Sequence, residues 1–156
     1  MSKHQNKKEI TRLIPSIAID SNTFRNLGFI NYLEINRERI HIHLPSIVYL
    51  EVGYYFMSKG ISWDGYEKQL KRFDSKSLTW NLVDQRTVLE HAIVNKESLP
   101  FKTHVRDFII GVQCMNAKVH LITHNKRHFQ WCTGITIFSP EEFTSAILQD
   151  KDQEAA

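Results

Sequence analysis

The stretch LIPSIAIDSNTF, residues 13–24, decides the expected fold. Its apolar run from Leu13 to Ile19 leads directly into the polar residues Asp20-Ser21-Asn22-Thr23. The apolar run predicts a buried strand, and the four polar residues are of the types that favour helix N-termini. A strand that runs straight into a helix is the repeating unit of α/β proteins.

Strands and helices are expected to alternate along the rest of the chain. The alternation of apolar and polar residues from Arg39 to Leu44 predicts a second strand. Further strands are expected at 78–83, 118–123 and 135–138, and helices at 47–57, 63–76, 84–94, 104–116 and from Ser139 onward. This order predicts an α/β fold, a three-layer α/β/α sandwich with a mainly parallel central sheet.

A single domain is expected at residues 12–149, between a polar N-terminal tail at 1–11 and a C-terminal tail at 150–156. With 42% hydrophobic and 24% charged residues, the chain has enough apolar material for one core without a disulfide or structural zinc. No apolar run approaches the roughly 20 residues that span a membrane, and the polar N-terminus lacks a secretory signal. The two cysteines form no CxxC pair, so we expect a cytoplasmic protein without membrane contact.

Glu51 is the one charged residue in the otherwise apolar segment from Ile47 to Met57. Because this segment has no polar stripe, the carboxylate is expected to be mostly buried. A buried charge without compensation costs several kcal/mol, so a cation or hydrogen-bond donors must accompany it. An arginine partner and a metal ion are both open at this point.

Two further acids lie where strands end or helices begin. Asp20 ends the first strand, and Asp107 is expected in the first turn of the helix at 104–116, where the helix dipole favours an anion. Gly111, one turn later, is expected to leave room beside the Asp107 carboxylate. Each acid alone is explained by an ordinary helix-end role.

Together with Glu51, these acids predict a metal site. All three are expected at the carboxyl edge of a parallel sheet, which is where α/β proteins bind ligands. Clustered carboxylates repel one another, and a hard divalent cation with oxygen ligands removes that conflict. We therefore expect Mg²⁺ or Mn²⁺ to be held by Asp20, Glu51 and Asp107.

Four motifs in this order resemble the PIN-domain nucleases, especially the toxin nucleases of toxin–antitoxin pairs. The motifs are IAIDSNTF, LPSIVYLEVGYYF, HVRDFIIGVQC and LITHNKRHF, and the resemblance spans about residues 15–143. It implies a PIN-like fold and assigns the three metal-binding acids to Asp20, Glu51 and Asp107. Asn125 matches a fourth catalytic position that is Asp in many members, so one negative charge is missing here.

The resemblance implies a metal-dependent endoribonuclease that hydrolyses RNA phosphodiester bonds. Ser21 and Asn22 are expected to position the first acid, a metal-bound water or the RNA, although a helix-cap role is open for both. Lys126 and Arg127 follow Asn125 directly and are expected to hold the RNA backbone, unless they form a plain solvated turn.

An antitoxin protein and a second copy of the chain are the expected protein partners. The apolar residues from Ile47 to Phe56 and the helix from Trp63 favour a homodimer. Three other functions are open: a housekeeping RNA-processing nuclease, a catalytically inactive PIN-fold RNA-binding or scaffold module, and a metal-dependent phosphatase or DNA nuclease.

His120, His124 and His128 recur at every fourth position. Because the first is expected on a strand and the second in a turn, they do not share a helix face. Zinc binding by this trio is therefore not expected.

Overall fold

The computed structural model describes residues 15–78, 80 and 82–155. Its centre is a five-stranded sheet with the order β3-β2-β1-β4-β5, in which every neighbouring pair is parallel. The strands are β1 (Ser16–Ile19), β2 (His41–Pro45), β3 (Lys76–Leu78), β4 (His120–Ile122) and β5 (Ile137–Phe138). The predicted parallel sheet is confirmed.

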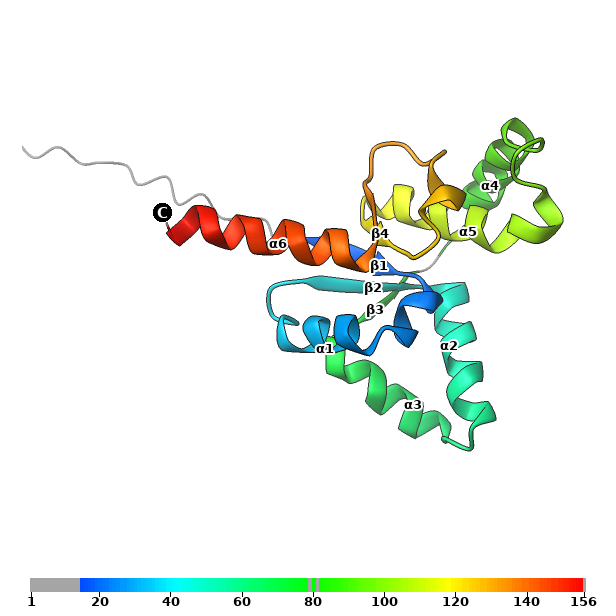
Figure 1. Cartoon of the computed structure of the whole chain (residues 1–156). Helices are drawn as coiled ribbons and strands as arrows, with labels where there is room; N and C mark the ends of the chain where they lie inside the picture. The colour runs from blue at the N-terminus through cyan, green and yellow to red at the C-terminus, as the bar shows by residue number, and fades with distance from the viewer. Residues whose placement is uncertain (1–14, 79, 81, 156) are drawn as a thin grey trace, which may run out of the picture.

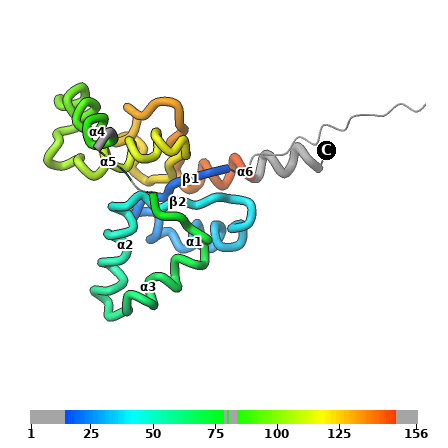
Figure 2. Tube along the Cα trace, turned by 180° about the vertical axis from the view of Figure 1, so that it is seen from behind, coloured from blue at the N-terminus to red at the C-terminus, as the bar shows by residue number. Residues whose placement is uncertain are grey.

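Helices cover both faces of this sheet. The α-helices are α1 (Leu27–Ile35), α2 (Ser46–Ser58), α3 (Trp63–Leu70), α4 (Leu82–Val94), α5 (Phe101–Ala117) and α6 (Pro140–Ala155). Three 3₁₀ helices join them: η1 (Ser21–Arg25), η2 (Lys71–Phe73) and η3 (Lys126–Phe129). The helices α1, α2 and α3 lie on one side and α4 and α5 on the other (Figure 1), and the view from behind shows the same division (Figure 2). The three-layer sandwich is therefore also confirmed.

The core is densest around β1. Ile17, Ala18 and Ile19 have no exposed surface, because β2 and β4 flank the strand and helices cover both of its faces. A second cluster of buried residues joins α4 to α5 and includes Val88 and Phe108. This cluster fixes α5, which carries several of the residues discussed below.

The strand order reverses between β1 and β4. The chain runs from β1 to β2 and β3 on one side, then crosses to β4 and β5 on the other. Parallel crossover connections are right-handed, so this reversal places the connecting helices on opposite faces. In α/β proteins, ligands commonly bind at the carboxyl ends of the strands on either side of such a reversal, here β1 and β4. Asp20 directly follows β1, and Thr123 directly follows β4.

Several element boundaries differ from the predicted ones. The third strand is at Lys76–Leu78 and not at 78–83, and α4 begins at Leu82, before Asp84. Helix α5 begins at Phe101 because the carbonyl of its N-cap Pro100 accepts hydrogen bonds from the backbone of Thr103 and His104. Asp107 therefore lies in the second turn, and the prediction that it belongs to the first turn is wrong. The dipole effect of the helix end is weaker there.

The structure describes the C-terminal end of the chain but not its N-terminal end. Helix α6 packs on β5 and α1 and continues to Ala155, beyond residue 149, where the domain was expected to end. The predicted N-terminal tail at 1–11 lies outside the described residues. Within the described part of the chain, no helix is both long and apolar enough to cross a lipid bilayer.

Candidate active site

Three acids from three elements approach one another at the carboxyl edge of the sheet. Asp20 follows β1, Glu51 lies on α2 and Asp107 lies on α5. The side chains of Asp20 and Asp107 are 0% and 7% exposed. The Glu51 side chain is 38% exposed, so it is less buried than the other two acids. The outer face of α2, with Leu50 and Tyr54, is open to solvent and leaves Glu51 at the rim of the site.

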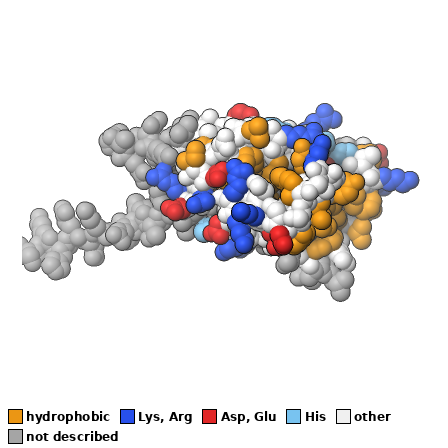
Figure 3. Space-filling view, turned by 90° about the horizontal axis from the view of Figure 1, so that it is seen from below, with side chains coloured by type: hydrophobic (Ala, Val, Ile, Leu, Met, Phe, Trp, Pro, Cys, Tyr) orange, Lys and Arg blue, Asp and Glu red, His pale blue; other side chains and the backbone are white. Residues whose placement is uncertain are grey.

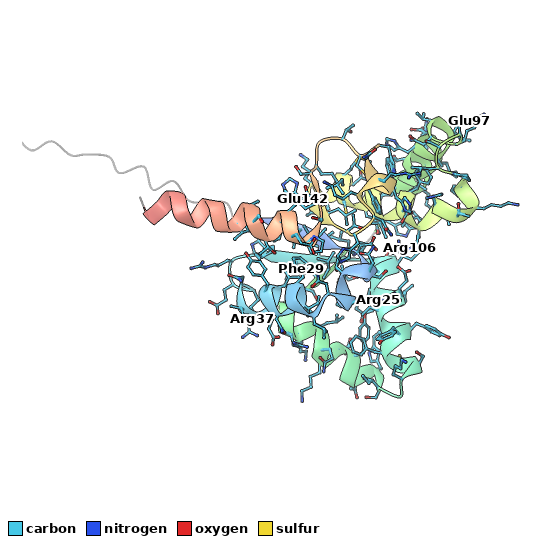
Figure 4. All side chains as sticks on the ribbon, viewed as in Figure 1. Arg25, Phe29, Arg37, Glu97, Arg106 and Glu142 are labelled. Carbon is cyan, nitrogen blue, oxygen red and sulfur yellow. The ribbon has the colours of Figure 1, made fainter. Side chains whose placement is uncertain are left out.

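The guanidinium of Arg106 joins the three acids. Its Nη2 donates to Asp20 Oδ1 at 2.7 Å and to Glu51 Oε1 at 2.8 Å, and its Nη1 donates to Asp107 Oδ1 at 2.9 Å. Its Nε also lies 3.1 Å from Glu51 Oε2. Figure 4 labels Arg106 where α5, α2 and the sheet meet. The arginine partner that the sequence left open for Glu51 is therefore present.

The charges at this point do not cancel. Three carboxylates face one guanidinium, which leaves an excess of negative charge. Burial lowers the pKa of Arg106, but hydrogen bonds to Glu51 and the charge of Asp20 outweigh burial and raise the pKa overall. Burial raises the pKa of the Asp107 carboxyl, although the charges of Arg106 and His128 act in the opposite direction.

Asp20 is the most firmly held of the acids. Its Oδ1 accepts a hydrogen bond from the backbone N–H of Ser21 at 2.7 Å, and its Oδ2 accepts one from the Thr123 hydroxyl at 2.8 Å. Thr123 has no exposed surface and also accepts from the backbone N–H of Asn125 at 3.0 Å. Sequence reasoning missed Thr123. Its place at the end of β4, beside the end of β1, was the available signal.

Ser21 and Asn22 lie within this network. The Ser21 hydroxyl accepts a hydrogen bond from Arg106 Nη2 at 3.2 Å, and Asn22 Oδ1 accepts one from the backbone N–H of His124 at 3.3 Å. Asn22 thus ties the start of η1 to the turn after β4. The Ser21 hydroxyl thus shares the Arg106 guanidinium with the acids, and Asn22 reaches them only through Thr123, to whose hydroxyl its amide donates at 3.4 Å.

The other predicted residues lie farther out. Asn125 is exposed, and among the described residues no hydrogen bond joins its side chain to the acids. Lys126 Nζ pairs with Glu142 of α6 at 2.8 Å, and Arg127 is exposed. The structure therefore directs Lys126 toward α6 and away from the acids.

Arg106 is the residue that sequence reasoning missed most clearly. In the HVRDFIIGVQC motif, the sequence assigns a metal-binding role to Asp107 and none to Arg106. Its position directly before Asp107, in a chain expected to cluster three carboxylates, was the available signal.

Two histidines approach the second oxygen of Asp107. His128 Nδ1 lies 3.1 Å from Asp107 Oδ2, and the rings of His128 and His104 are 4.8 Å apart between centroids. His120, by contrast, accepts a hydrogen bond through Nδ1 from the backbone N–H of Thr136 at 2.9 Å. The structure thus groups His128 with His104 and not with His120.

The sequence predicted that Gly111 leaves room beside the Asp107 carboxylate, but the structure shows that the space next to Gly111 is filled. A Cβ built on Gly111 would lie 2.6 Å from the Trp131 ring and 2.8 Å from Cys132 Sγ. The glycine allows the turn after η3 to pack directly on α5.

A groove of about 750 Å³ opens beside Glu51. Ser21, Asn22 and Glu51 are among the residues that line it, and Arg25 adds positive charge to its wall, whereas Arg72, which also lines it, is paired with Glu34. The remaining lining residues include Phe24, Tyr55, Phe56 and Phe73. On the face seen from below, hydrophobic side chains gather on one part and Lys and Arg side chains beside it (Figure 3).

The chemistry of the donor set suits a hard divalent cation, but Arg106 bridges the three acids and their oxygens do not form a coordination shell as they stand: among the described residues, the three whose ligand atoms all lie within 4.8 Å of one another are His104, Asp107 and His128. Carboxylate oxygens are the ligands that Mg²⁺ and Mn²⁺ prefer, and the excess negative charge favours a cation of charge two. Arg106 already bonds to each acid, so an ion among them requires some of these bonds to be exchanged. The Arg106 side chain is 27% exposed and so has access to solvent.

The fold is similar to that of chains in solved VapBC structures. VapBC-1 from nontypeable Haemophilus influenzae matches with a TM-score of 0.57 and 17% identity, over 81% of this chain and 98% of that chain. VapBC2 from Rickettsia felis, bound to a DNA fragment from their promoter, matches with a TM-score of 0.56 and 15% identity, over 80% and 98%. DNA-bound VapBC from Salmonella typhimurium matches with a TM-score of 0.55 and 17% identity, over 81% and 98%.

These similarities confirm the PIN-like fold that the motif order implied. No protein-family model and no curated protein sequence matches the chain. At such low identity the similarity is one of fold, so the activity has to be argued from the residues of the site.

Proposed function

We propose that this chain is a metal-dependent endoribonuclease that acts as the cytoplasmic toxin of a toxin–antitoxin pair. The observation that carries the proposal is the convergence of Asp20, Glu51 and Asp107, from three separate elements, on a single guanidinium. This convergence lies at the reversal point of the sheet, where α/β proteins bind ligands. It also supports the reading of the four motifs as those of a PIN-type nuclease.

Asp20, Glu51 and Asp107 would hold Mg²⁺ or Mn²⁺ through their carboxylate oxygens. Such an ion, when bound, lowers the pKa of a coordinated water and offsets charge on the phosphate. Thr123 and the Ser21 N–H keep Asp20 in one orientation, which preorganises this side of the centre. Asn125 lies in the turn between β4 and η3 and can contribute a neutral carbonyl oxygen to the ion or a hydrogen bond to one of the acids.

The groove beside Glu51 is the expected path of the RNA strand. Its wall combines Arg25, which can bind phosphate, with aromatic side chains that can stack on bases. Ser21 and Asn22 lie where the groove reaches the acids, so they are placed to position the scissile phosphate. Arg127, which is exposed, extends the basic surface on the other side of the acids.

An antitoxin is the proposed protein partner. The similar chains belong to complexes named VapBC, and their fold extends over about four fifths of this chain. A small gene immediately upstream whose product co-purifies with this chain would support the toxin role. A neighbourhood without such a gene would favour a housekeeping RNA-processing nuclease.

One observation favours a second function, that of a catalytically inactive RNA-binding or scaffold module. Arg106 already forms an ion pair with each of the three acids without any metal, and Asn125 lacks the charge of an aspartate. In that case Arg106 would be a permanent structural partner. Cleavage activity separates the two functions.

The test is cleavage of a fluorescently labelled single-stranded RNA by the purified chain. We expect cleavage with Mn²⁺ or Mg²⁺, none with EDTA, and a loss of more than about 100-fold in Glu51→Gln, because even partners of metal ligands are worth about 10–100-fold. Glu51 is half-exposed, so this variant should fold. Glu67→Gln, at an exposed position on α3, is the matched control. Binding of RNA without metal-dependent cleavage would support the inactive module instead.

A further inference from the structure

The second oxygen of Asp107 faces a different set of groups from the first. Oδ1 bonds to Arg106, whereas Oδ2 lies 3.1 Å from His128 Nδ1. One ligand atom from each of His104, Asp107 and His128 lies within 4.8 Å of the others. His104 and Asp107 are three residues apart on α5 and so share a face of that helix.

His104 is oriented as metal-binding histidines are. Its Nδ1 lies 3.0 Å from the carbonyl oxygen of Pro100. The Thr103 hydroxyl, which donates to the same carbonyl, also lies 2.9 Å from Nδ1. With the proton on Nδ1, both oxygens accept from it and the lone pair on Nε2 is available for a metal ion. Histidines that bind metals commonly donate their other ring N–H to a backbone carbonyl in this way, which fixes the tautomer and the ring orientation.

His128 is held by the packing of η3 on α5. The backbone N–H of His128 donates to Asn125 at 3.0 Å, and its carbonyl accepts from the Trp131 indole at 2.7 Å. The Trp131 ring packs against Phe108 of α5 at 5.1 Å between centroids. The two histidines therefore come from separate elements that a shared hydrophobic contact keeps together.

We propose that His104, Asp107 and His128 form a binding site for a zinc-class transition metal ion. Two imidazoles and one carboxylate, with a coordination position open to water, are a ligand set found in zinc enzymes. Imidazole nitrogens favour zinc, nickel and copper over magnesium. Ligand atoms at about 2.1 Å from one ion lie roughly 3.5 Å apart, so small rotations of the partly exposed rings complete the site.

This site is distinct from the all-oxygen centre of the proposed nuclease, although the two share Asp107. Its ligands are mainly nitrogen, and it does not require RNA cleavage. The earlier expectation of no zinc at His120, His124 and His128 concerned a different set of residues. Only His128 is common to both.

The test is Zn²⁺ binding to the full, untagged chain, measured by isothermal titration calorimetry in an excess of Mg²⁺. We expect one Zn²⁺ per chain and a loss of affinity of more than about 100-fold in His104→Gln and in His128→Gln, since loss of a ligand exceeds the 10–100-fold effect of its partners. His124→Gln, at an exposed position near His128, is the matched control and should bind as the wild type does. Unchanged affinity in both ligand variants would overturn the proposal.

Glu51→Gln separates this proposal from the nuclease. We expect it to lose cleavage while it retains Zn²⁺ binding. X-ray absorption spectroscopy at the zinc edge tests the site in the wild-type chain, without any variant. We expect two imidazole nitrogens at about 2.0–2.1 Å from the zinc ion. A shell of oxygen ligands alone would contradict the site, whatever the outcome of the RNA assay.

Discussion

At the scale of single residues, Arg106 is the group on which the acidic centre depends. It forms ion pairs with Asp20, Glu51 and Asp107 and is the counter-cation of all three. Removal of one partner from such a group leaves the others uncompensated, which is more costly than loss of the pair itself. A divalent ion at this position would compete with the guanidinium for the same oxygens.

Arg106→Gln is therefore expected to make the stability of the chain depend on metal. In EDTA the variant should lose up to about 3 kcal/mol of unfolding free energy, because three carboxylates lose their cation. Added Mg²⁺ or Mn²⁺ should restore most of this loss and should raise the melting temperature more in the variant than in the wild type. Calorimetric melting with and without metal measures both. Equal metal responses in the two chains would show that Arg106 does not compete for a metal site.

Asp107→Asn keeps the shape of the side chain and removes its charge. Cleavage of RNA should fall by more than about 100-fold. Burial raises the pKa of Asp107, so the folded chain holds this proton more tightly than the unfolded chain. The contribution of this group to stability therefore decreases as the pH rises above the ordinary pKa, and the variant lacks that decrease.

Melting curves in EDTA between pH 4 and pH 8 compare Asp107→Asn with the wild type. The variant should be at least as stable near neutral pH, and the difference should shrink as the pH falls toward the ordinary range of aspartate. If the variant cleaves RNA at the wild-type rate, Asp107 is not a ligand of the catalytic metal.

At the scale of elements, the contact between α5 and η3 positions Asp107 and His128. Gly111 makes this contact possible, because Trp131 and Cys132 occupy the space where a Cβ would be. Gly111→Ala should destabilise the chain by about 1–3 kcal/mol through overpacking. Gly28→Ala is the matched control: its Cβ would meet only Asn26 Oδ1 at 3.7 Å, so gained helix propensity should stabilise α1 by up to about 1 kcal/mol. Urea denaturation measures both changes, and equal stability of the two variants would contradict the packing account.

The element level also shows how far the sequence predicts this molecule. The apolar run before Asp20 identified β1, because a strand buried on both faces is apolar throughout. The start of α5 was missed by three residues, since the role of Pro100 as an N-cap is a matter of backbone conformation. Arg106 could not be placed from its spacing alone. A long side chain on a helix can lie against solvent or reach across the site, and tertiary contacts decide between the two.

At the scale of the whole molecule, the outer face of α2 exposes several large apolar side chains to solvent. Leu50 and Tyr54 are 66% and 78% exposed, and Tyr55, Met57 and Trp63 are exposed beside them. Apolar patches of this kind commonly mark interaction surfaces. The homodimer expected from the sequence stays a prediction, and this face is its proposed interface.

Tyr54→Glu places a charge in the middle of that face. Because the side chain is exposed, folding should be unaffected, whereas self-association should weaken by at least about tenfold. Sedimentation at tens of micromolar should show dimers for the wild type and mainly monomers for the variant. Leu89→Glu, an exposed apolar position on α4, is the control and should stay dimeric. A wild-type chain that sediments only as a monomer would contradict the prediction.

The central claim is that Asp20, Glu51 and Asp107 hold a divalent metal ion, and a crystal of the chain soaked in Mn²⁺ tests it most directly. The account predicts an anomalous peak with carboxylate oxygens of these acids at roughly 2.0–2.6 Å, and at least one of the Arg106 hydrogen bonds to them broken. A peak at His104 and His128 alone would support the second site and contradict the first. Saturating Mn²⁺ with no ion among the three acids, and with Arg106 still bonded to each of them, would contradict the claim.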